Sequence, residues 1–405
     1  MTRSIRLAIC FSAALFAGAV SGQSQTSQID EATDGPAGAA PAAFVYVSNI
    51  TNPNGPTYIN NVYAYTAAAD GKLTPVPGSP FKDNIFTLAV NGKYLFGGNG
   101  DGNIDSYLME SNGSLKKVET INPTVYNPGG CGNPGQFRID HSGDILYNVS
   151  EDPDCFGTHF QYFKINDTTG KLDYTGDTAE LGTSIFEIDF LGNNKDAYSP
   201  ICTVYDHEEV GYTVGLERHS DGDLTEVNLG NLGPATPEEG NSYCPSTFAT
   251  DPTDHMAALL QDEDSDGDLY GLPVIATYTA SANGKLTTSS TYHNMPVVET
   301  ATETYESLSM RMSPSGKYLA VGAINGVEIF HFKGSAQATK YKTLLAGKTI
   351  VEVYWDSNNH LYALVSDSPG TGKLYVYTVT STSVTEATGS PYSIPNPISV
   401  IVQPR

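Results

Sequence analysis

The chain has 405 residues, with 45 acidic residues against 21 lysines and arginines, and a formal net charge of −24. Phosphate binding needs clustered cations, so this balance argues against a nucleic-acid partner. Tyrosine, phenylalanine and glycine are plentiful (25, 15 and 40 residues), and no long stretch has the 3.6-residue period of a helix, so we expect an all-β protein.

The first 22 residues differ from the rest of the chain. Two arginines precede an apolar run over residues 7–20, and small residues follow it. This pattern is typical of a secretory signal peptide, and the run is short for a membrane span. We therefore expect a secreted or periplasmic protein with no transmembrane anchor. Residues 23–43 are of low complexity and predict a flexible leader, and residues 44–405 are expected to form one domain.

A repeated unit of short strands fills residues 44–405. Its first copy contains the apolar run FVYV, the alternating run NVYAYT, and KLTPVP after an Asp-Gly turn, which is a strong hairpin signal. Strands equivalent to FVYV recur at intervals of 42 to 62 residues, around Val45, Leu95, Leu146, Ala197, Ala257, Leu319 and Leu361. Four strands per unit at this spacing are typical of a β-propeller blade, so we predict a seven-bladed β-propeller with four antiparallel strands per blade.

The first copy begins at its second strand and lacks an opening strand. The C-terminal run ISVIVQ, residues 398–403, resembles the strands that open other copies, such as FTLAV at residues 86–90. A ring has an unpaired edge wherever its chain starts. We therefore expect the C-terminal strand to join the N-terminal blade and close the ring.

In such a blade, the loops from the second to the third strand and from the outermost strand to the next blade lie on one face, which we call the top face. The opposite face is called the bottom face. Ligands commonly bind to the top face, because its loops vary without disturbing the packing between blades. The longest of these loops belong to blades three to five.

Four cysteines lie on or beside these loops once Cys10 is removed with the signal peptide. An even number in an exported chain predicts two disulfides. We expect Cys131 to pair with Cys155, and Cys202 with Cys244, because each pair would join a loop to a neighbouring loop or strand end.

The acidic loop of blade five matches the first half of a calcium loop. Oxygen-bearing side chains at alternate positions, followed by a glycine for the turn, make Asp262, Asp264, Asp266 and Asp268 candidate Ca²⁺ ligands. Pro273 stands where an EF-hand has its final glutamate, so a complete EF-hand is excluded. The alternative is a solvated acidic loop. No cofactor other than this possible Ca²⁺ is expected.

The top loop of blade four carries a second polar cluster, consisting of Tyr205, Asp206, His207 and Glu208. We treat it as the candidate ligand-binding patch, for a small molecule, a carbohydrate or a protein. The alternative is again a solvated loop, which is the usual role of a run of acids.

Two short motifs carry a family resemblance. The strand Tyr46-Val47-Ser48-Asn49 and the run LTPVPGSP at residues 73–80 resemble the YVTN-type, lactonase-like seven-bladed propellers, which include 6-phosphogluconolactonase-like proteins. The likeness extends over residues 44–405. The resemblance implies the propeller fold, and the family includes both lactone hydrolases and binding or surface-layer propellers.

Two functions are therefore expected. The first is binding of a ligand or partner by the top face of a monomeric scaffold. The alternative is an extracytoplasmic lactonase whose site lies at the mouth of the central channel. Lactone hydrolysis needs a base or an activated water, and a cation near the developing oxyanion.

Arg138, Glu187 and Arg311 are the candidate catalytic residues, because they lie on predicted innermost strands together with Asp140 and Asp189. The other interpretation is that these charges only pair with one another around a water-filled tunnel. Convergence of arginines and acids in the channel would favour the lactonase.

Overall fold

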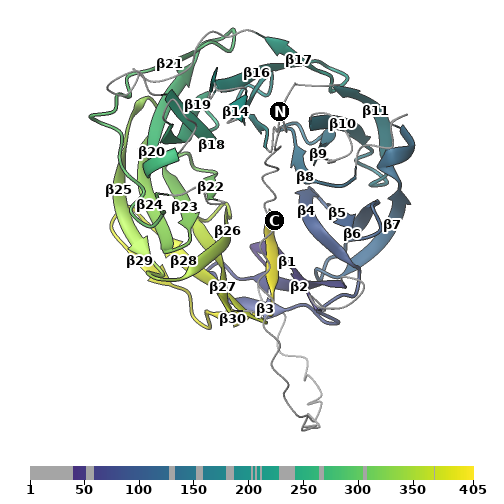
Figure 1. Ribbon diagram of the computed structural model, residues 1–405. Coiled ribbons are helices and arrows are strands. Elements are labelled where there is room, and N and C mark those ends of the chain that lie inside the picture. Colours follow the sequence, from purple (N-terminus) through teal and green to yellow (C-terminus); the bar gives the residue numbers. More distant parts are fainter. Residues whose placement is uncertain are drawn as a thin grey trace, which may run out of the picture. The chain divides into compact units, whose positions relative to one another are not determined.

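The computed structural model describes residues 40–51, 59–126, 133–151, 158–178, 187–201, 204–205, 208–209, 212–227, 242–263, 269–303, 308–368 and 370–405. Ala40–Arg405 form one compact unit. Within the described residues this unit is a ring of seven four-stranded antiparallel sheets (Figure 1). The predicted seven-bladed propeller is therefore confirmed. The expected signal peptide lies outside the described residues.

Helices are nearly absent from this part of the chain. The described residues contain one short 3-10 helix, Pro123–Tyr126, and no α-helix. None of their helices is long and apolar enough to cross a membrane.

The strands follow the predicted blade order. From the innermost strand outward, blade one contains β31 (Pro397–Pro404), β1 (Ala43–Ile50), β2 (Asn60–Ala67) and β3 (Leu73–Pro75). In the same direction, blade two contains β4 (Ile85–Asn91), β5 (Tyr94–Asn99), β6 (Ile104–Met109) and β7 (Leu115–Ile121). Blade three contains β8 (Gln136–Ile139), β9 (Ile145–Glu151), β10 (Thr158–Ile165) and β11 (Leu172–Thr178). Blade four contains β12 (Asp189–Phe190), β13 (Asp196–Ile201), β16 (Tyr212–Arg218) and β17 (Leu224–Val227).

The remaining blades have the same arrangement. Blade five contains β18 (Ser242–Thr250), β19 (His255–Glu263), β20 (Leu269–Ala280) and β21 (Leu286–Thr288). Blade six contains β22 (Ser309–Met312), β23 (Tyr318–Ala323), β24 (Gly326–Lys333) and β25 (Ala336–Leu344). Blade seven contains β26 (Thr349–Trp355), β27 (His360–Ser368), β28 (Thr371–Val379) and β29 (Val384–Glu386), with β30 (Tyr392–Ser393) also paired to β28. A separate hairpin, β14 (Val204–Tyr205) and β15 (Glu208–Glu209), lies between β13 and β16 in the sequence.

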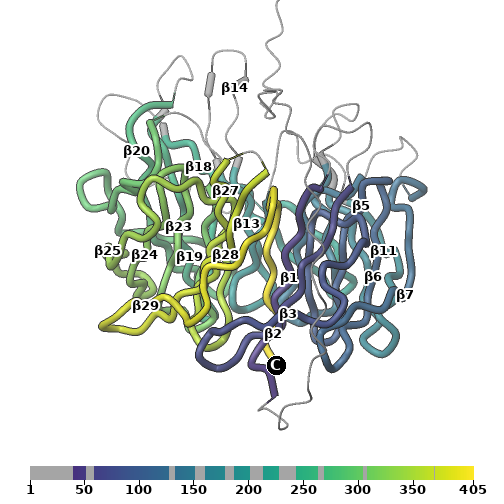
Figure 2. Tube along the Cα trace, turned by 90° about the horizontal axis from the view of Figure 1, so that it is seen from below, coloured from purple at the N-terminus to yellow at the C-terminus, as the bar shows by residue number. Residues whose placement is uncertain are grey.

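Ring closure occurs as predicted, in blade one. β1 pairs with β2 on one side and with β31 on the other, with Phe44 opposite Gln403 and Val47 opposite Val400. Figure 2 shows the purple β1 beside the yellow C-terminal strand. The N-terminal and C-terminal ends of the propeller thus share one sheet, in which β31 covers the inner edge of β1.

The hydrophobic core lies between neighbouring blades. One cluster joins Phe96 and Ile104 of blade two to Phe137, Leu146 and Phe163 of blade three. The second strand of each blade is covered on both faces, which explains continuous apolar runs such as those of β1 and β5.

Hydrogen bonds from tyrosines connect the second strand of one blade to the next blade. Tyr46 Oη donates to the carbonyl of Gly113 at 2.9 Å, and Tyr147 Oη donates to that of Gly222 at 2.9 Å. Tyr94 and Tyr198 make the same kind of bond to later turns. Gly113 has φ 89°, and a Cβ on it would lie 2.8 Å from Val76, so only glycine fits this close approach.

Replacing Tyr46 by phenylalanine is expected to lower the free energy of unfolding by about 1–2 kcal/mol, because the buried Gly113 carbonyl loses its partner. Thermal unfolding followed by circular dichroism measures the change. Tyr63→Phe is the matched control, since Tyr63 is half-buried and its hydroxyl makes no hydrogen bond within the described residues. Equal melting temperatures for the two variants would contradict the prediction.

Candidate functional site

A cavity of about 330 Å³ occupies the axis of the ring. Its lining includes at least one residue from each of the inner strands, which are β4, β8, β12, β18, β22, β26 and β31. The cavity is therefore the central channel of the propeller. A site in this channel is assembled from segments more than 300 residues apart in the sequence, which only closure of the ring brings together.

One end of the cavity reaches the bottom face. His141 and Pro314 belong to its lining, and both are exposed residues in turns between a first and a second strand. A molecule in the cavity would thus be reached from the face opposite to the long top loops.

The carboxylate of Glu187 is the centre of the polar cluster in the channel. Its Oε1 accepts hydrogen bonds from Arg138 Nη2 and, at 3.1 Å, from Arg311 Nη1. Its Oε2 accepts one from Thr247 Oγ1 at 2.6 Å. Burial opposes ionisation of Glu187, but Arg138, Arg311 and Thr247 outweigh it and hold the pKa below its usual value. Glu187 is consequently a charged partner of two arginines.

Glu352 links this cluster to the ring-closing strand. Its Oε1 lies 3.4 Å from Arg311 Nη2, and its Oε2 accepts hydrogen bonds from Val400 N at 2.7 Å and Ser399 Oγ at 2.9 Å. Burial disfavours the charged guanidinium of Arg311, but Glu187 and Glu352 prevail and raise its pKa. Arg311 is therefore held between two acids from different blades.

The pKa of Asp189 is shifted in the opposite direction to that of Glu187. Asp189 is half-buried in the cavity wall, and its Oδ2 accepts a hydrogen bond from Thr250 N at 2.9 Å. Burial, followed by repulsion from Glu187, raises the pKa of Asp189 in spite of the nearby Arg138 and Arg311. A carboxyl with a raised pKa beside a cavity is suited to accept and release a proton.

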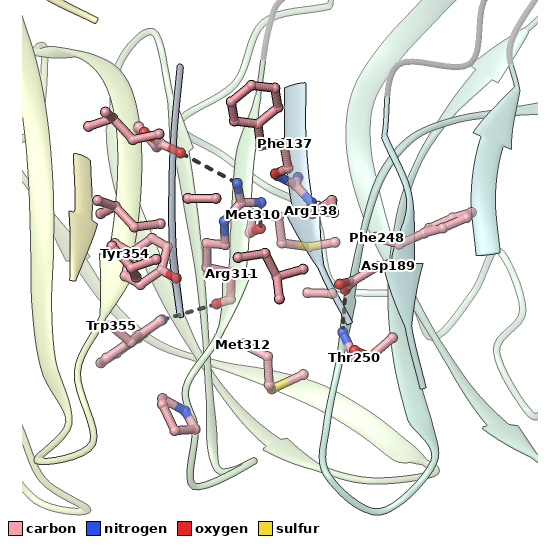
Figure 3. A pocket seen from close by; sticks show the side chains of 18 of the residues that line it. Phe137, Arg138, Asp189, Phe248, Thr250, Met310, Arg311, Met312, Tyr354 and Trp355 are labelled. Atoms are coloured by element: carbon pink, nitrogen blue, oxygen red, sulfur yellow. Dashed lines mark hydrogen bonds and ion pairs between the residues drawn. The ribbon is translucent and has the colours of Figure 1, made fainter. Parts of the chain in front are cut away.

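Aliphatic, aromatic and thioether side chains form most of the rest of the lining. Figure 3 shows Arg138, Arg311 and Asp189 around the same cavity as Phe137 and Trp355. The indole Nε1 of Trp355 donates to the carbonyl of Arg311 at 3.0 Å, which fixes the position of both strands. Several polar groups thus converge on a cavity whose exposed surface is more polar than apolar.

The five charged residues that the sequence predicted on inner strands do not all lie at the same site. Arg138, Glu187 and Arg311 meet in one cluster, and Asp189 lines the same cavity. Asp140 does not join them. Its carboxylate pairs with Arg218 at 2.5 Å and accepts hydrogen bonds from the backbone of the following turn, so it has a structural role.

Sequence reasoning missed Glu352, Tyr354 and Phe248 as residues of the cavity. The signal for Glu352 was a single acid within the otherwise apolar strand TIVEVYW. An acid in that position of an inner strand needs either solvent or a cation. Its partner Arg311 lies in another blade, so the sequence contains no local sign of the pair.

The top-face patch is only partly described. Val204–Tyr205 and Glu208–Glu209 form the hairpin β14–β15, in which Tyr205 is opposite Glu208. Asp206 and His207 lie outside the described residues. The role of these four residues in ligand binding stays a prediction.

The candidate calcium loop follows β19. Asp262 is half-buried at the end of that strand, and burial raises its pKa. The other three candidate ligands, Asp264, Asp266 and Asp268, lie outside the described residues. Within the described part of the chain, no group of three histidines, cysteines or acids could hold a metal ion.

Cys244 is disulfide-bonded. Cys131, Cys155 and Cys202 lie outside the described residues. Both predicted pairings therefore stay predictions.

The fold resembles that of several solved structures. A candidate 6-phosphogluconolactonase from Bacteroides uniformis is 15% identical, with a TM-score of 0.61 and coverage of 89% of this chain and 99% of the other. A periplasmic gluconolactonase from Pseudomonas aeruginosa is 14% identical, with a TM-score of 0.60 and the same coverage. A hypothetical selenium-binding protein from Sulfolobus tokodaii is 11% identical, with a TM-score of 0.59 and coverage of 90% and 94%.

These identities support a shared fold only. The predicted resemblance to lactonase-like seven-bladed propellers is confirmed at that level. No protein-family model and no curated protein matches the sequence.

Proposed function

We propose that this protein is an extracytoplasmic hydrolase that opens a sugar lactone in its central channel. The observation that carries the proposal is the convergence of Arg138, Arg311, Glu352 and Asp189 on one channel cavity, with Glu187 paired to both arginines behind its wall. Two proteins with a similar fold are described as a candidate lactonase and a gluconolactonase. The signal-peptide pattern at the N-terminus supports a place outside the cytoplasm.

The roles follow from the charges in the cavity. Water attacks the lactone carbonyl, and Asp189 accepts the proton that the water loses. The carbonyl oxygen becomes an oxyanion, which the guanidiniums of Arg138 and Arg311 stabilise. When the ring C–O bond breaks, Asp189 returns the proton to the leaving ring oxygen. Glu187 and Glu352 hold the two arginines in position.

Replacing Asp189 by asparagine is expected to lower kcat for lactone hydrolysis by about 100-fold or more, because the proton acceptor is lost. In the unchanged protein, kcat/KM should rise with pH as Asp189 ionises at its raised pKa. This rise in the pH profile should be missing in the variant. Initial rates on a panel of sugar lactones, corrected for spontaneous hydrolysis, test both points.

The control is Glu217→Gln, which changes an acid on the outer part of blade four that pairs with Lys195. Its rates should equal those of the unchanged protein. Unaltered turnover in Asp189→Asn, or no turnover of any lactone by the unchanged protein, would refute the proposed hydrolysis.

Binding by the top face is a second candidate, favoured by the hairpin β14–β15. This hairpin interrupts blade four between β13 and β16 and takes no part in its sheet. A ligand or partner of the patch Tyr205, Asp206, His207 and Glu208 is part of this second proposal.

The acidic loop is the proposed Ca²⁺ site of the same face. If it binds with a dissociation constant near 10 μM, 1 mM Ca²⁺ should stabilise the protein by about 2.7 kcal/mol and raise Tm accordingly. Thermal unfolding with and without Ca²⁺ measures this, and Asp264→Asn combined with Asp266→Asn is the control that should remove the shift. An unchanged Tm at millimolar Ca²⁺ would rule the site out.

A further inference from the structure

The charges of the channel define which lactone the cavity accepts. We propose that the substrate is an uncharged sugar lactone and that the channel rejects a phosphorylated one. This inference rests on the proposed function and names its substrate class. Three observations support it: the hydrogen bonds that the two arginines make within the protein, the net charge of the groups around the cavity, and the lack of further lysines and arginines in the loops.

Each arginine uses part of its five N–H donors on groups of the protein. Arg138 donates from Nη1 to the carbonyl of Phe137 at 3.1 Å and from Nη2 to Glu187. Arg311 donates from Nη1 to Glu187 at 3.1 Å and to the carbonyl of Met310 at 3.0 Å, and its Nη2 faces Glu352. A phosphate would compete with Glu187 and Glu352 for the Nη donors that form the paired contact between guanidinium groups and phosphates.

The balance of charge also disfavours an anion. Two cations, Arg138 and Arg311, lie among three carboxylates, Glu187, Glu352 and Asp189. The cluster has one net negative charge when Asp189 is ionised and none when it is protonated. A phosphate monoester carries about −1.5 to −2 charges at neutral pH. In this partly enclosed cavity, repulsion between the phosphate and the carboxylates is screened less than at an exposed surface.

Within the described residues, no other lysine or arginine lines the cavity to neutralise a phosphate. Among the described residues that line the cavity, Arg138 and Arg311 are the only two, and His141 is the only histidine. The loops outside the described residues cannot supply a cation of this kind, because their sequences contain no lysine or arginine. These segments are residues 52–58, 127–132, 152–157, 179–186, 202–203, 206–207, 210–211, 228–241, 264–268, 304–307 and 369.

A neutral sugar ring suits the cavity better. The half-buried side chains of Tyr354 and Met312 offer apolar surface to its C–H groups. Asp189 offers a polar partner for its hydroxyls. Neither interaction requires breaking an ion pair.

The test compares D-glucono-1,5-lactone with its 6-phosphate as substrates at pH 7.5 and low ionic strength. The expected kcat/KM is at least about 100-fold higher for the uncharged lactone, equivalent to about 2.7 kcal/mol. An equal or higher kcat/KM for the phosphorylated lactone would overturn the inference.

A binding experiment separates this inference from the proposed hydrolysis. Calorimetry with the non-hydrolysable gluconolactam and its 6-phosphate measures charge preference without turnover. If the protein binds only the neutral lactam and hydrolyses no lactone, the preference for an uncharged ligand is supported and the proposed hydrolysis is refuted. Tighter or equal binding of the phosphate, or binding of neither compound, would overturn the preference.

Two variants probe the source of the preference. Glu352→Gln removes one acid while its amide oxygen can still accept from Val400 N, and it should improve the relative affinity for the lactam 6-phosphate about tenfold. Asp189→Asn removes a charge that makes no ion pair within the described residues, so it tests the same effect if Glu352→Gln fails to fold. Glu217→Gln is the control and should leave the ratio unchanged. No change in either channel variant contradicts the proposed charge exclusion.

Discussion

Ending the chain at Asn396 is expected to abolish cooperative folding of the propeller. The missing strand β31 forms the inner strand of blade one and pairs with β1 from Ala43 to Asn49. It also buries Val400, Ile401 and Val402, which together contribute about 4–9 kcal/mol of hydrophobic stabilisation. This loss is comparable with the whole free energy of unfolding of a typical domain. The truncated chain would also expose the edge of β1, which favours aggregation.

Circular dichroism in the near ultraviolet, thermal unfolding and size-exclusion chromatography measure this outcome. A graded version replaces Val400 by aspartate, which places an unpaired carboxylate in the core and should cost at least about 3 kcal/mol. Ser381→Asp, in the exposed turn after β28, is the matched control and should change stability little. A truncated chain that melts cooperatively at the temperature of the intact protein would show that ring closure does not stabilise the fold.

Replacing Glu187 by glutamine is expected to lower the free energy of unfolding by about 3–5 kcal/mol, because it leaves Arg138 and Arg311 without their shared counter-charge in a buried place. Glutamine has nearly the same shape, so packing is preserved and the change reports on charge. Urea unfolding at pH 7 measures the effect. Glu217→Gln breaks the exposed pair with Lys195 and should cost about 1 kcal/mol or less.

The pH dependence of stability provides a second signature of Glu187. Its pKa is lower in the folded protein than its ordinary value of 4.5, so its contribution is present above pH 4.5 and is lost as the pH falls through the folded pKa. Asp189, with a raised pKa, has the opposite sign: its contribution is greatest below pH 3.8 and is lost as the pH rises through its folded pKa. Glu187→Gln should therefore flatten the acid limb below pH 4.5. An unchanged limb would contradict the assignment.

The fold was predictable because its signals are local. Turn pairs such as Asp70-Gly71 and the apolar second strands recur along the chain, and each turn requires its own residues whatever the distant context. The closing strand was predictable because residues 398–403 resemble other inner strands and the first blade lacks one. The observed strand is one residue longer at each end, Pro397–Pro404.

The site was predictable only in part. The repeat correctly placed Arg138 and Arg311 on inner strands, whereas Glu187 lies just before β12 because that strand is shorter than predicted. An inner strand also has two faces. The strand β12 has only two residues, so alternation could not show that Asp189 lines the cavity. Asp140 was predicted to lie on an inner strand, but β8 ends at Ile139 and Asp140 pairs with Arg218 instead. Glu352 was missed because both of its partners, Arg311 and the backbone of β31, lie on other blades.

The sequence by itself determined the blades, their number and the way the ring closes, since these depend on turns and on alternation within about 50 residues. Only the tertiary structure decided which charges meet on the axis and which of them are neutralised there. The reason is that an ion pair depends on a separation of a few ångströms between side chains from different blades, and no pattern within one blade specifies that distance.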